Sequence, residues 1–414
     1  MRRLSTIILA ATLASLPAWA QPAREVTVDA AIERGEVRPL TGFLGGLRDG
    51  TPEELLQPLN IGLWRIGHQF RGRIAGGLTA AVDRVEALGA KYKLVMSDLI
   101  GSKPTDWAVY EADVKKLVAQ VGPRAKTIIW EPVNEPDISH KPIDTYYELY
   151  AHAFRALREA EPEAQICGPG FAFPNYDRYR AFLDVCRQRG VECNYLAWHY
   201  TGWDPLAPER GKWGLGRLRE LIAAYPEQKI REIHCDEWGA GPDKPTPEKP
   251  GRLQPGLALA WFQALEEVYK VDRACRANWG KLDDYLGGIV DEQHQPHPAY
   301  HVYRLYGQQK GLTRVAATST LPRLNALAAK GKDRIELLIG SLDPQSGPLE
   351  VTFHHVTLDT PSVRVDLIPA DDAAGVLPTN RIPSLPVQVS SFMGTVNVKL
   401  PGISENQVYW LEVR

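Results

Sequence analysis

The chain is poor in cysteine, because its 414 residues include only Cys167, Cys186, Cys193, Cys235 and Cys275. Five cysteines are too few for a disulfide-built scaffold, and the odd number leaves at least one thiol unpaired. We expect Cys186 and Cys193 to be joined first, across a helix-to-strand turn, whereas the others lie in apolar runs that favour buried thiols. No metal-ligand spacing links the five, so they do not indicate a metal site.

An excess of positive charge is also missing. The chain has 48 Lys and Arg residues against 50 Asp and Glu residues, and no long basic run occurs in it. Nucleic acid is therefore not an expected partner, because binding a polyanion needs a positive field. With 44% hydrophobic and 24% charged residues, the composition is typical of a globular protein with one large domain and a smaller one.

Long hydrophobic runs are absent after the first twenty residues, so we expect no membrane span in the rest of the chain. Residues 1–20 combine a charged start, the apolar run "LSTIILAATLASLP" and an A-x-A sequence that ends at Ala20. This pattern predicts a signal peptide at 1–20 and an exported, periplasmic or extracellular protein. A membrane anchor is the alternative, but the apolar run is shorter than the roughly 20 residues that a spanning helix needs.

Between residues 41 and 311 short β-like runs alternate with amphipathic helical stretches. The eight runs are "TGFLGGL", "GLWRIG", "YKLVMS", "TIIWEPVN", "QICGPG", "YLAWHY", "IREIHCDE" and "RACRANW". Eight such units over about 250 residues predict an α/β fold, a (β/α)8 TIM barrel. A doubly wound open sheet is the alternative, but no Gly-rich phosphate loop follows the first run.

After "HPAYHVYRLYGQQKG" the pattern changes to strands of alternating polarity with turn residues between them. We therefore predict a barrel domain at 21–311 and a C-terminal antiparallel β-sandwich domain at 312–414. The segment "REVTVDAA" at residues 24–31 is expected to add an edge strand to that sandwich. We find no internal repeat or low-complexity linker, so the two domains are expected to pack closely.

Reactive groups of a TIM barrel lie at the carboxyl ends of its strands. Carboxylates that end a strand are therefore the candidates for catalysis. In "TIIWEPVNEPD", Glu135 follows the strand and precedes Pro136, whereas Glu131 lies inside the strand and is expected to make a buried structural contact. The run "IHCDEWGAG" places Asp236 and Glu237 at the rim across the barrel. Two opposed carboxyl groups suit cleavage of a glycosidic bond, which needs neither metal nor cofactor.

The motifs "WEPVNEPD" and "CDEWG", about a hundred residues apart, resemble the Asn-Glu-Pro and strand-7 motifs of the clan A retaining glycoside hydrolases. With the helix before the C-terminal sandwich, residues 25–414 are most similar in order and spacing to glycoside hydrolase family 39. That family comprises β-xylosidases, α-L-iduronidases and exopolysaccharide hydrolases.

The resemblance implies a role for individual residues. Glu135 is the expected acid/base, Glu237 the expected nucleophile, and Asn134 the expected contact of the sugar 2-hydroxyl. The expected substrate-binding residues are Arg65, His68, His199, Tyr200, Trp279 and Trp203. Arg65 is expected beside the nucleophile, and Trp279 is expected to form a platform under the sugar, with a core tryptophan as the alternative. His199 and Tyr200 are adjacent, whereas the family more often has one residue between them, so which ring faces the cavity stays open.

The expected function is a retaining O-glycoside hydrolase that acts from the chain end on a β-linked sugar, as β-xylosidases do. An endo-acting polysaccharide hydrolase keeps the same chemistry, and an inactive carbohydrate-binding barrel is the alternative from another class. The expected partner is an oligosaccharide or polysaccharide, and a homo-oligomer is a further possibility that the sequence does not decide. The acid/base is expected to stay protonated near neutral pH while the nucleophile is charged.

Overall fold

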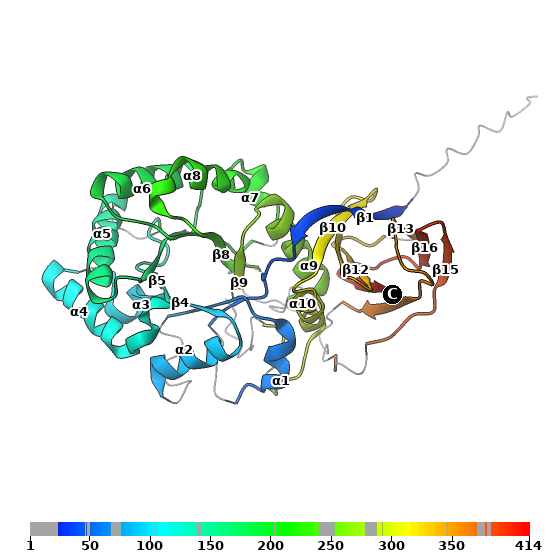
Figure 1. Cartoon of the computed structure of the whole chain (residues 1–414), viewed down its shortest axis with the longest axis horizontal. Helices are drawn as coiled ribbons and strands as arrows, with labels where there is room; N and C mark the ends of the chain where they lie inside the picture. Colours follow the sequence, from blue (N-terminus) through cyan, green and yellow to red (C-terminus); the bar gives the residue numbers. More distant parts are fainter. Residues whose placement is uncertain are drawn as a thin grey trace, which may run out of the picture.

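The computed structural model describes residues 24–414 apart from 46, 48–49, 68–75, 103, 139–141, 203, 240–252, 278–287, 292, 346, 371–376 and 379–381. The predicted signal peptide at 1–20 lies outside the described residues. Figure 1 shows a strand barrel ringed by helices and, beside it, a second domain made of strands. None of the helices in the described ranges has both the length and the apolar character needed to cross a bilayer.

The first domain is a closed parallel barrel of eight strands, so the predicted TIM barrel is confirmed. Its strands are β2 (Phe43–Leu44), β3 (Leu63–Ile66), β4 (Lys91–Val95), β5 (Ile129–Glu131), β6 (Gln165–Phe171), β7 (Tyr195–Tyr200), β8 (Glu232–Trp238) and β9 (Arg273–Arg276). Pairing of Phe43 with Arg276 closes the cylinder between β2 and β9. The apolar runs of the sequence are buried on both faces, as expected for strands covered by helices outside and packed side chains inside.

Helices that follow the strands cover the outside of the barrel. The longer ones are α2 (Gly77–Ala87), α4 (Trp107–Val121), α5 (Ile143–Ala160), α6 (Tyr176–Arg189), α9 (Pro255–Gln263) and α10 (Pro298–Gln308); shorter ones are α1 (Glu53–Leu56), α3 (Ser97–Ile100), α7 (Ala207–Arg210) and α8 (Leu218–Ala224). Side chains cap the starts of α4 and α6, where Asp106 and Asn175 accept backbone N–H bonds. Gly190, with φ of 63°, ends α6 in the left-handed conformation.

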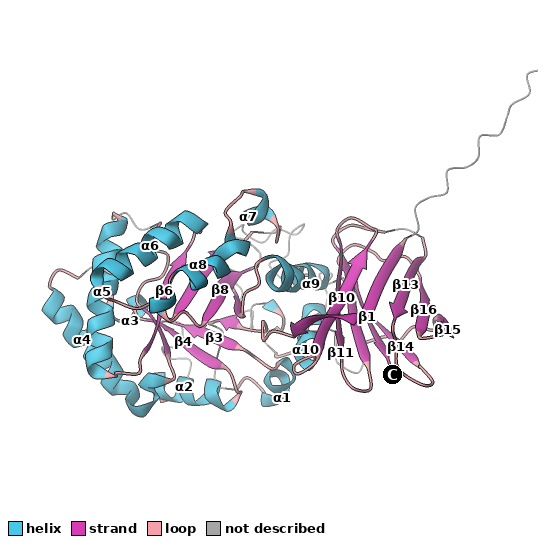
Figure 2. Cartoon of the chain, turned by 45° about the horizontal axis from the view of Figure 1, so that its top comes forward, coloured by secondary structure: helices cyan, strands magenta, loops and turns pink. Residues whose placement is uncertain are grey.

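The second domain is one hydrogen-bonded sheet in the order β14-β17-β12-β11-β10-β1-β13-β16-β15. These strands are β1 (Glu25–Glu36), β10 (Thr313–Ser319), β11 (Leu324–Lys330), β12 (Ile335–Ser341), β13 (Leu349–His354), β14 (Val363–Ile368), β15 (Gln388–Phe392), β16 (Thr395–Leu400) and β17 (Val408–Val413). Strands from both halves of this order share one hydrophobic core, so the sheet folds over on itself as a sandwich (Figure 2).

The N-terminal segment joins this sheet in its middle, not at its edge. β1 pairs antiparallel with β10 and parallel with β13, so the expected edge position was wrong. The alternation of "EVTVDA" explains the position, because Val26, Val28 and Ala30 all point into the core of the second domain. β1 therefore ties the start of the described chain to its C-terminal domain (Figure 1).

The two domains contact each other through α9 and α10. Helix α9 packs against β11 and β12, and the Gly256 N–H at its start donates to the Asn406 carbonyl at 3.0 Å. Arg314 of β10 also pairs with Glu267 at 2.7 Å. The close packing expected from the absence of a linker is observed.

The expected Cys186–Cys193 disulfide was wrong, since all five cysteines are free and buried. The Cys193 thiol donates to the Tyr195 carbonyl at 3.0 Å and lies under Gly168 of β6, whereas Cys186 belongs to α6. Burial raises the pKa of the Cys193 thiol to about 12, which disfavours the reactive thiolate.

Candidate active site

One candidate acid, Glu135, follows the end of β5, and the other, Glu237, lies near the end of β8. Beyond β5 the chain still follows β6, because Asn134 bridges Gly170 and the Glu135 N–H donates to the Gly170 carbonyl at 3.1 Å. Glu135 has a φ of 44°, in the left-handed region. This conformation costs a residue with a side chain about 1–3 kcal/mol, so the turn that aims Glu135 is held by its surroundings.

A bulge in β8 sets the position of the other acid. Trp198 pairs with Cys235, but the next residue, His199, pairs with Glu237, so Asp236 is skipped. The extra residue changes which side chains of β8 face inward. As a result His199 and Glu237 lie side by side at the end of the barrel.

His199 contacts both acids. Its Nδ1 lies 2.9 Å from Glu135 Oε1 and 3.7 Å from Glu237 Oε1. One atom each of Glu135, His199 and Glu237 can be chosen so that all three lie within 4.8 Å of one another. Glu237 is 2% exposed, and its Oε2 has no hydrogen-bond partner among the described residues. One carboxylate oxygen of Glu237 is thus held by the protein, and the other keeps its capacity to accept a hydrogen bond.

Arg65, at the end of β3, is the central cation of the site. Its Nε and Nη2 donate to both oxygens of Glu131 at 2.7 Å, and its Nη1 donates to Glu237 Oε1 at 2.6 Å. Nη2 also donates to Asn134 Oδ1 at 2.6 Å. Burial alone acts to lower the pKa of Arg65, but the carboxylates, Glu131 first, raise it above its ordinary value. The guanidinium therefore stays charged and orients Glu237.

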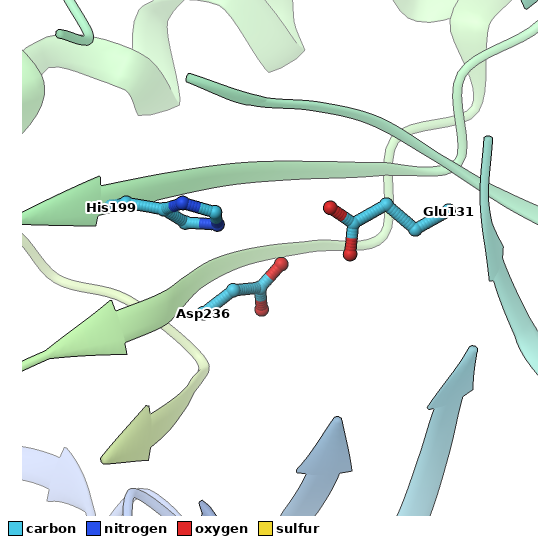
Figure 3. Close-up of side chains that lie close together, drawn as sticks. All are labelled: Glu131, His199 and Asp236. Atoms are coloured by element: carbon cyan, nitrogen blue, oxygen red, sulfur yellow. The ribbon is translucent and has the colours of Figure 1, made fainter. Parts of the chain in front are cut away.

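Beneath the acids lies a second buried ion pair. Lys93 of β4 donates to Asp236 Oδ2 at 2.6 Å, and both residues are fully buried. Asp236 was expected at the rim, next to Glu237, and this expectation was wrong. The bulge turns Asp236 toward the barrel interior. Figure 3 shows Asp236, His199 and Glu131 directed toward one another from three segments of the barrel wall. Lys93 was not predicted from the sequence, although a lone charge inside the apolar run "YKLVMS" is a signal for a buried partner.

The structure separates the adjacent rings of β7. His199 is 1% exposed and faces the acids, whereas Tyr200 is half-buried and packs on Trp213 and Trp261 with ring centroids 5.7 and 5.8 Å away. His199 is thus the ring of β7 that faces the cavity, and within the described ranges no tyrosine hydrogen-bonds Glu237. Trp238 is buried and stacks on Tyr303, which is a packing role.

Three predicted binding residues, His68, Trp203 and Trp279, lie outside the described residues and stay predictions. The structure does bring together Glu135, Glu237, Asn134, Arg65 and His199. Glu131, expected as a structural contact, is fully buried against Arg65.

Groups of carboxylates and a histidine are also donors of the type that bind cations. Arg65 binds Glu131 and Glu237, and Lys93 binds Asp236, so several of these oxygens already belong to an ion-pair network.

The environment of Glu135, the acid/base candidate, does not favour the protonated form that was expected. Burial acts to raise the pKa of Glu135, but its hydrogen bond and charge interaction with His199 lower the pKa below its ordinary value. Burial acts to lower the pKa of His199, but the charge of Glu237 and the hydrogen bond with Glu135 raise it. In the resting site the pair therefore favours a carboxylate and an imidazolium, not the protonated Glu135 that was expected.

Gly170 is the small residue that lets β6 approach this pair. A Cβ at this position would lie 2.7 Å from His199 Nε2 and 3.0 Å from Glu131 Oε1. We expect Gly170→Ala to lower the free energy of unfolding by about 1–3 kcal/mol, as overpacking does, in urea denaturation. Gly331→Ala, where the nearest atom is the end of the Leu312 side chain at 3.2 Å, is the control, and an equal loss in both variants would contradict the close approach.

No protein-family model matches the chain. A beta-xylosidase of Caldicellulosiruptor saccharolyticus is 19% identical over 280 residues, which are 61% of this chain and 56% of that protein. The chain therefore spans little more than half the length of the curated relative it matches.

Two solved structures are similar over nearly the whole chain. N2152 from Neocallimastix frontalis has a TM-score of 0.74 at 18% identity, covering 94% of this chain and 99% of that one. A family 39 glycoside hydrolase from Xanthomonas axonopodis pv. citri has a TM-score of 0.67 at 15% identity, covering 96% and 99%. Members of glycoside hydrolase families 30 and 51 are also similar.

The barrel with its C-terminal sheet is therefore a fold shared with glycoside hydrolases of families 30, 39 and 51. The similarity to glycoside hydrolase family 39 that the two sequence motifs indicated is confirmed.

Proposed function

We propose that the protein is a retaining glycoside hydrolase that removes a β-linked sugar from a chain end. The observation that carries this proposal is the meeting of Glu135 and Glu237, both within reach of His199 Nδ1. Retaining enzymes hold the two carboxyl groups about 5–5.5 Å apart, whereas inverting enzymes leave a wider gap for water. Carboxylate oxygens within 4.8 Å of each other favour retention.

In this mechanism Glu237 attacks the anomeric carbon while Glu135 protonates the leaving oxygen. Arg65 holds one oxygen of Glu237 at 2.6 Å and keeps the nucleophile oriented. Asn134 uses its Oδ1 to accept from Arg65, which leaves its NH2 group as the donor for the sugar 2-hydroxyl. Glu135, freed of its proton, then activates the water that releases the sugar.

The sugar class is proposed from the similar proteins. The curated relative is named a beta-xylosidase, so a terminal β-xyloside is the first substrate to test. A panel of aryl β-glycosides, with NMR detection of the first-formed anomer, tests sugar preference and stereochemistry together. We expect the β-anomer to appear first, and a first-formed α-anomer would contradict retention.

Release of single sugars from xylo-oligosaccharides supports exo action, whereas rapid shortening of a polymer supports endo action.

The acid/base role of Glu135 predicts a dependence on the leaving group. Glu135→Ala is expected to lower kcat/KM by about 10²- to 10⁴-fold for alkyl β-glycosides and much less for dinitrophenyl β-glycosides, which leave without protonation. Glu111→Ala is the matched control, because Glu111 also binds a histidine, His152, at 2.6 Å, but on the helical surface. Equal losses for both substrates would contradict the assignment.

We also propose that the protein is exported to the periplasm or the cell exterior. The charged start, apolar run and A-x-A sequence of residues 1–20 support this location. N-terminal sequencing of the mature protein tests the proposal. A first residue at Gln21 is expected in the periplasmic or secreted fraction, and protein that keeps Met1 and is confined to the cytoplasmic fraction would contradict export.

A further inference from the structure

His199 is surrounded by negative charge. Its Nδ1 contacts Glu135 and lies near Glu237. One of its ring nitrogens also lies within 4.8 Å of carboxylate oxygens of both Glu131 and Asp236. Its Nε2 is buried and has no hydrogen-bond partner among the described residues. The ring is thus placed to carry a positive charge between two pairs of carboxylates, Glu135 with Glu237 and Glu131 with Asp236.

The fixed cations of the site do not balance these carboxylates. Four acids face the ring, namely Glu131 and Glu135 from the β5 segment and Asp236 and Glu237 from β8. The permanent cations among them are Arg65 from β3, which binds Glu131 and Glu237, and Lys93 from β4, which binds Asp236. β6 contributes Gly170, which has no charge, and Cys167, whose thiol accepts from Lys93 Nζ at 3.2 Å. His234 of β8 lies 3.9 Å from Asp236, but burial lowers its pKa to about 4, so it adds no charge at neutral pH. Because unpaired buried charge is costly, the cluster retains protons.

We infer that His199 holds the proton that Glu135 delivers to the leaving oxygen, and that this proton crosses the Nδ1 to Oε1 contact of 2.9 Å. This inference rests on the proposed function and deepens it. His199 acts through Glu135 and does not touch the sugar, so it is a positioning residue that also stores a proton.

The step balances over one turnover. A Glu237 oxygen bonds to the anomeric carbon, and the bond to the leaving oxygen breaks with its electron pair on that oxygen. Glu135 protonates the oxygen and takes the proton of His199 Nδ1, leaving a neutral imidazole and an ionised Glu135. In the second half Glu135 removes a proton from the attacking water, the bond to Glu237 breaks, and the proton returns to His199.

The charges give this transfer a direction. The charge of Glu237 and the bond with Glu135 raise the pKa of His199 against the effect of burial. When Glu237 becomes a glycosyl ester it loses its charge, so the pKa of His199 falls and its proton moves to Glu135. When the ester is hydrolysed the charge returns and the imidazole is protonated again.

The substitution His199→Asn tests the inference. An asparagine amide keeps an N–H donor near the place of Nδ1 but carries no transferable extra proton. We expect kcat/KM for alkyl β-glycosides to fall by about 10²-fold, with dinitrophenyl β-glycosides largely spared. The alkaline limb of the alkyl-glycoside profile should move to lower pH, because Glu135 alone loses its proton before the coupled pair does.

The control is His152→Asn, since His152 also binds a glutamate, Glu111, at 2.6 Å but lies on the helical layer. It should leave both substrates and the pH profile unchanged. Equal loss of both substrates in His199→Asn, or an unmoved alkaline limb, would overturn the proton-storing role and leave a purely structural one.

A second measurement needs no turnover and covers the case in which His199→Asn misfolds. In protein with ¹⁵N-labelled histidine, NMR titration should show His199 as imidazolium at neutral pH. In Glu237→Gln its midpoint should fall by about 1–3 pH units, the size expected when a neighbouring charge is removed. A neutral His199 throughout the active pH range would overturn the inference. Wild-type protein inactive on every glycoside would instead refute the proposed function, while the titration still locates the proton.

Discussion

Replacing Glu237 with glycine is expected to lower kcat/KM for activated aryl β-glycosides by roughly 10⁴- to 10⁶-fold, as for other essential nucleophiles. The loss is large because Glu237 offers a buried oxygen that has no hydrogen-bond partner among the described residues, and it lies beside His199, which binds the acid/base. Glu135 and water cannot replace it, since no covalent intermediate then forms. Steady-state kinetics with dinitrophenyl β-glycosides measure the effect.

Azide should restore part of this activity, because a small anion fits the space vacated by the carboxylate. The product should be a glycosyl azide of inverted configuration. The matched control is Glu232→Gln, on the same strand but at the opposite end of the barrel, where Glu232 pairs with Lys91 at 2.7 Å. Barrel residues at that end serve stability, so its activity should persist. A small loss in Glu237→Gly, or azide products of retained configuration, would contradict the nucleophile assignment.

Replacing Lys93 with methionine is expected to lower the free energy of unfolding by about 3–5 kcal/mol, because it leaves a buried charge without its partner. Lys93 and Asp236 are both fully buried and lie 2.6 Å apart. Burial acts to raise the pKa of Asp236, but Lys93 and then Arg65 lower it below its ordinary value. Guanidinium denaturation at neutral pH measures the loss.

The pH dependence follows from the direction of that shift. A carboxyl group with a lowered folded pKa contributes stability above its unfolded pKa and loses it as the pH falls through the folded value. In Lys93→Met the carboxyl is expected to take up a proton instead, so the difference from wild type should shrink in acid. The double variant Lys93→Met with Asp236→Asn should recover most of the stability at neutral pH. Additive losses would show that the pair is not coupled.

Most of the fold could be predicted from the sequence, because each strand and helix of a TIM barrel shows its periodicity within its own short stretch of residues. Each of the eight predicted runs overlaps a barrel strand, although β9 ends at Arg276 and not at Trp279. The central place of β1 was not readable, because its partners are β10 and β13 at the far end of the chain. The Cys186–Cys193 disulfide was wrongly predicted because the spacing of two cysteines in the sequence does not show which way their side chains point.

The site was predictable where a residue ends a strand. Arg65, Asn134, Glu135 and Glu237 follow that rule and converge in the structure. The bulge that pairs His199 with Glu237 was not predictable, because one extra residue exchanges the inward and outward faces of a strand. The buried partner of Asp236 was missed for a related reason, since it comes from β4, well over a hundred residues earlier in the chain.

The central claim, that Glu237 bonds to the sugar while Glu135 serves as acid/base, is tested most directly by trapping the intermediate. A 2-deoxy-2-fluoro β-glycoside with a good leaving group slows hydrolysis of the ester, and peptide mass mapping then locates the label. We predict one sugar per chain, attached to the peptide that contains Glu237. A label on Glu135, or steady turnover of the parent glycoside with an inverted product and no labelled peptide, would contradict the account.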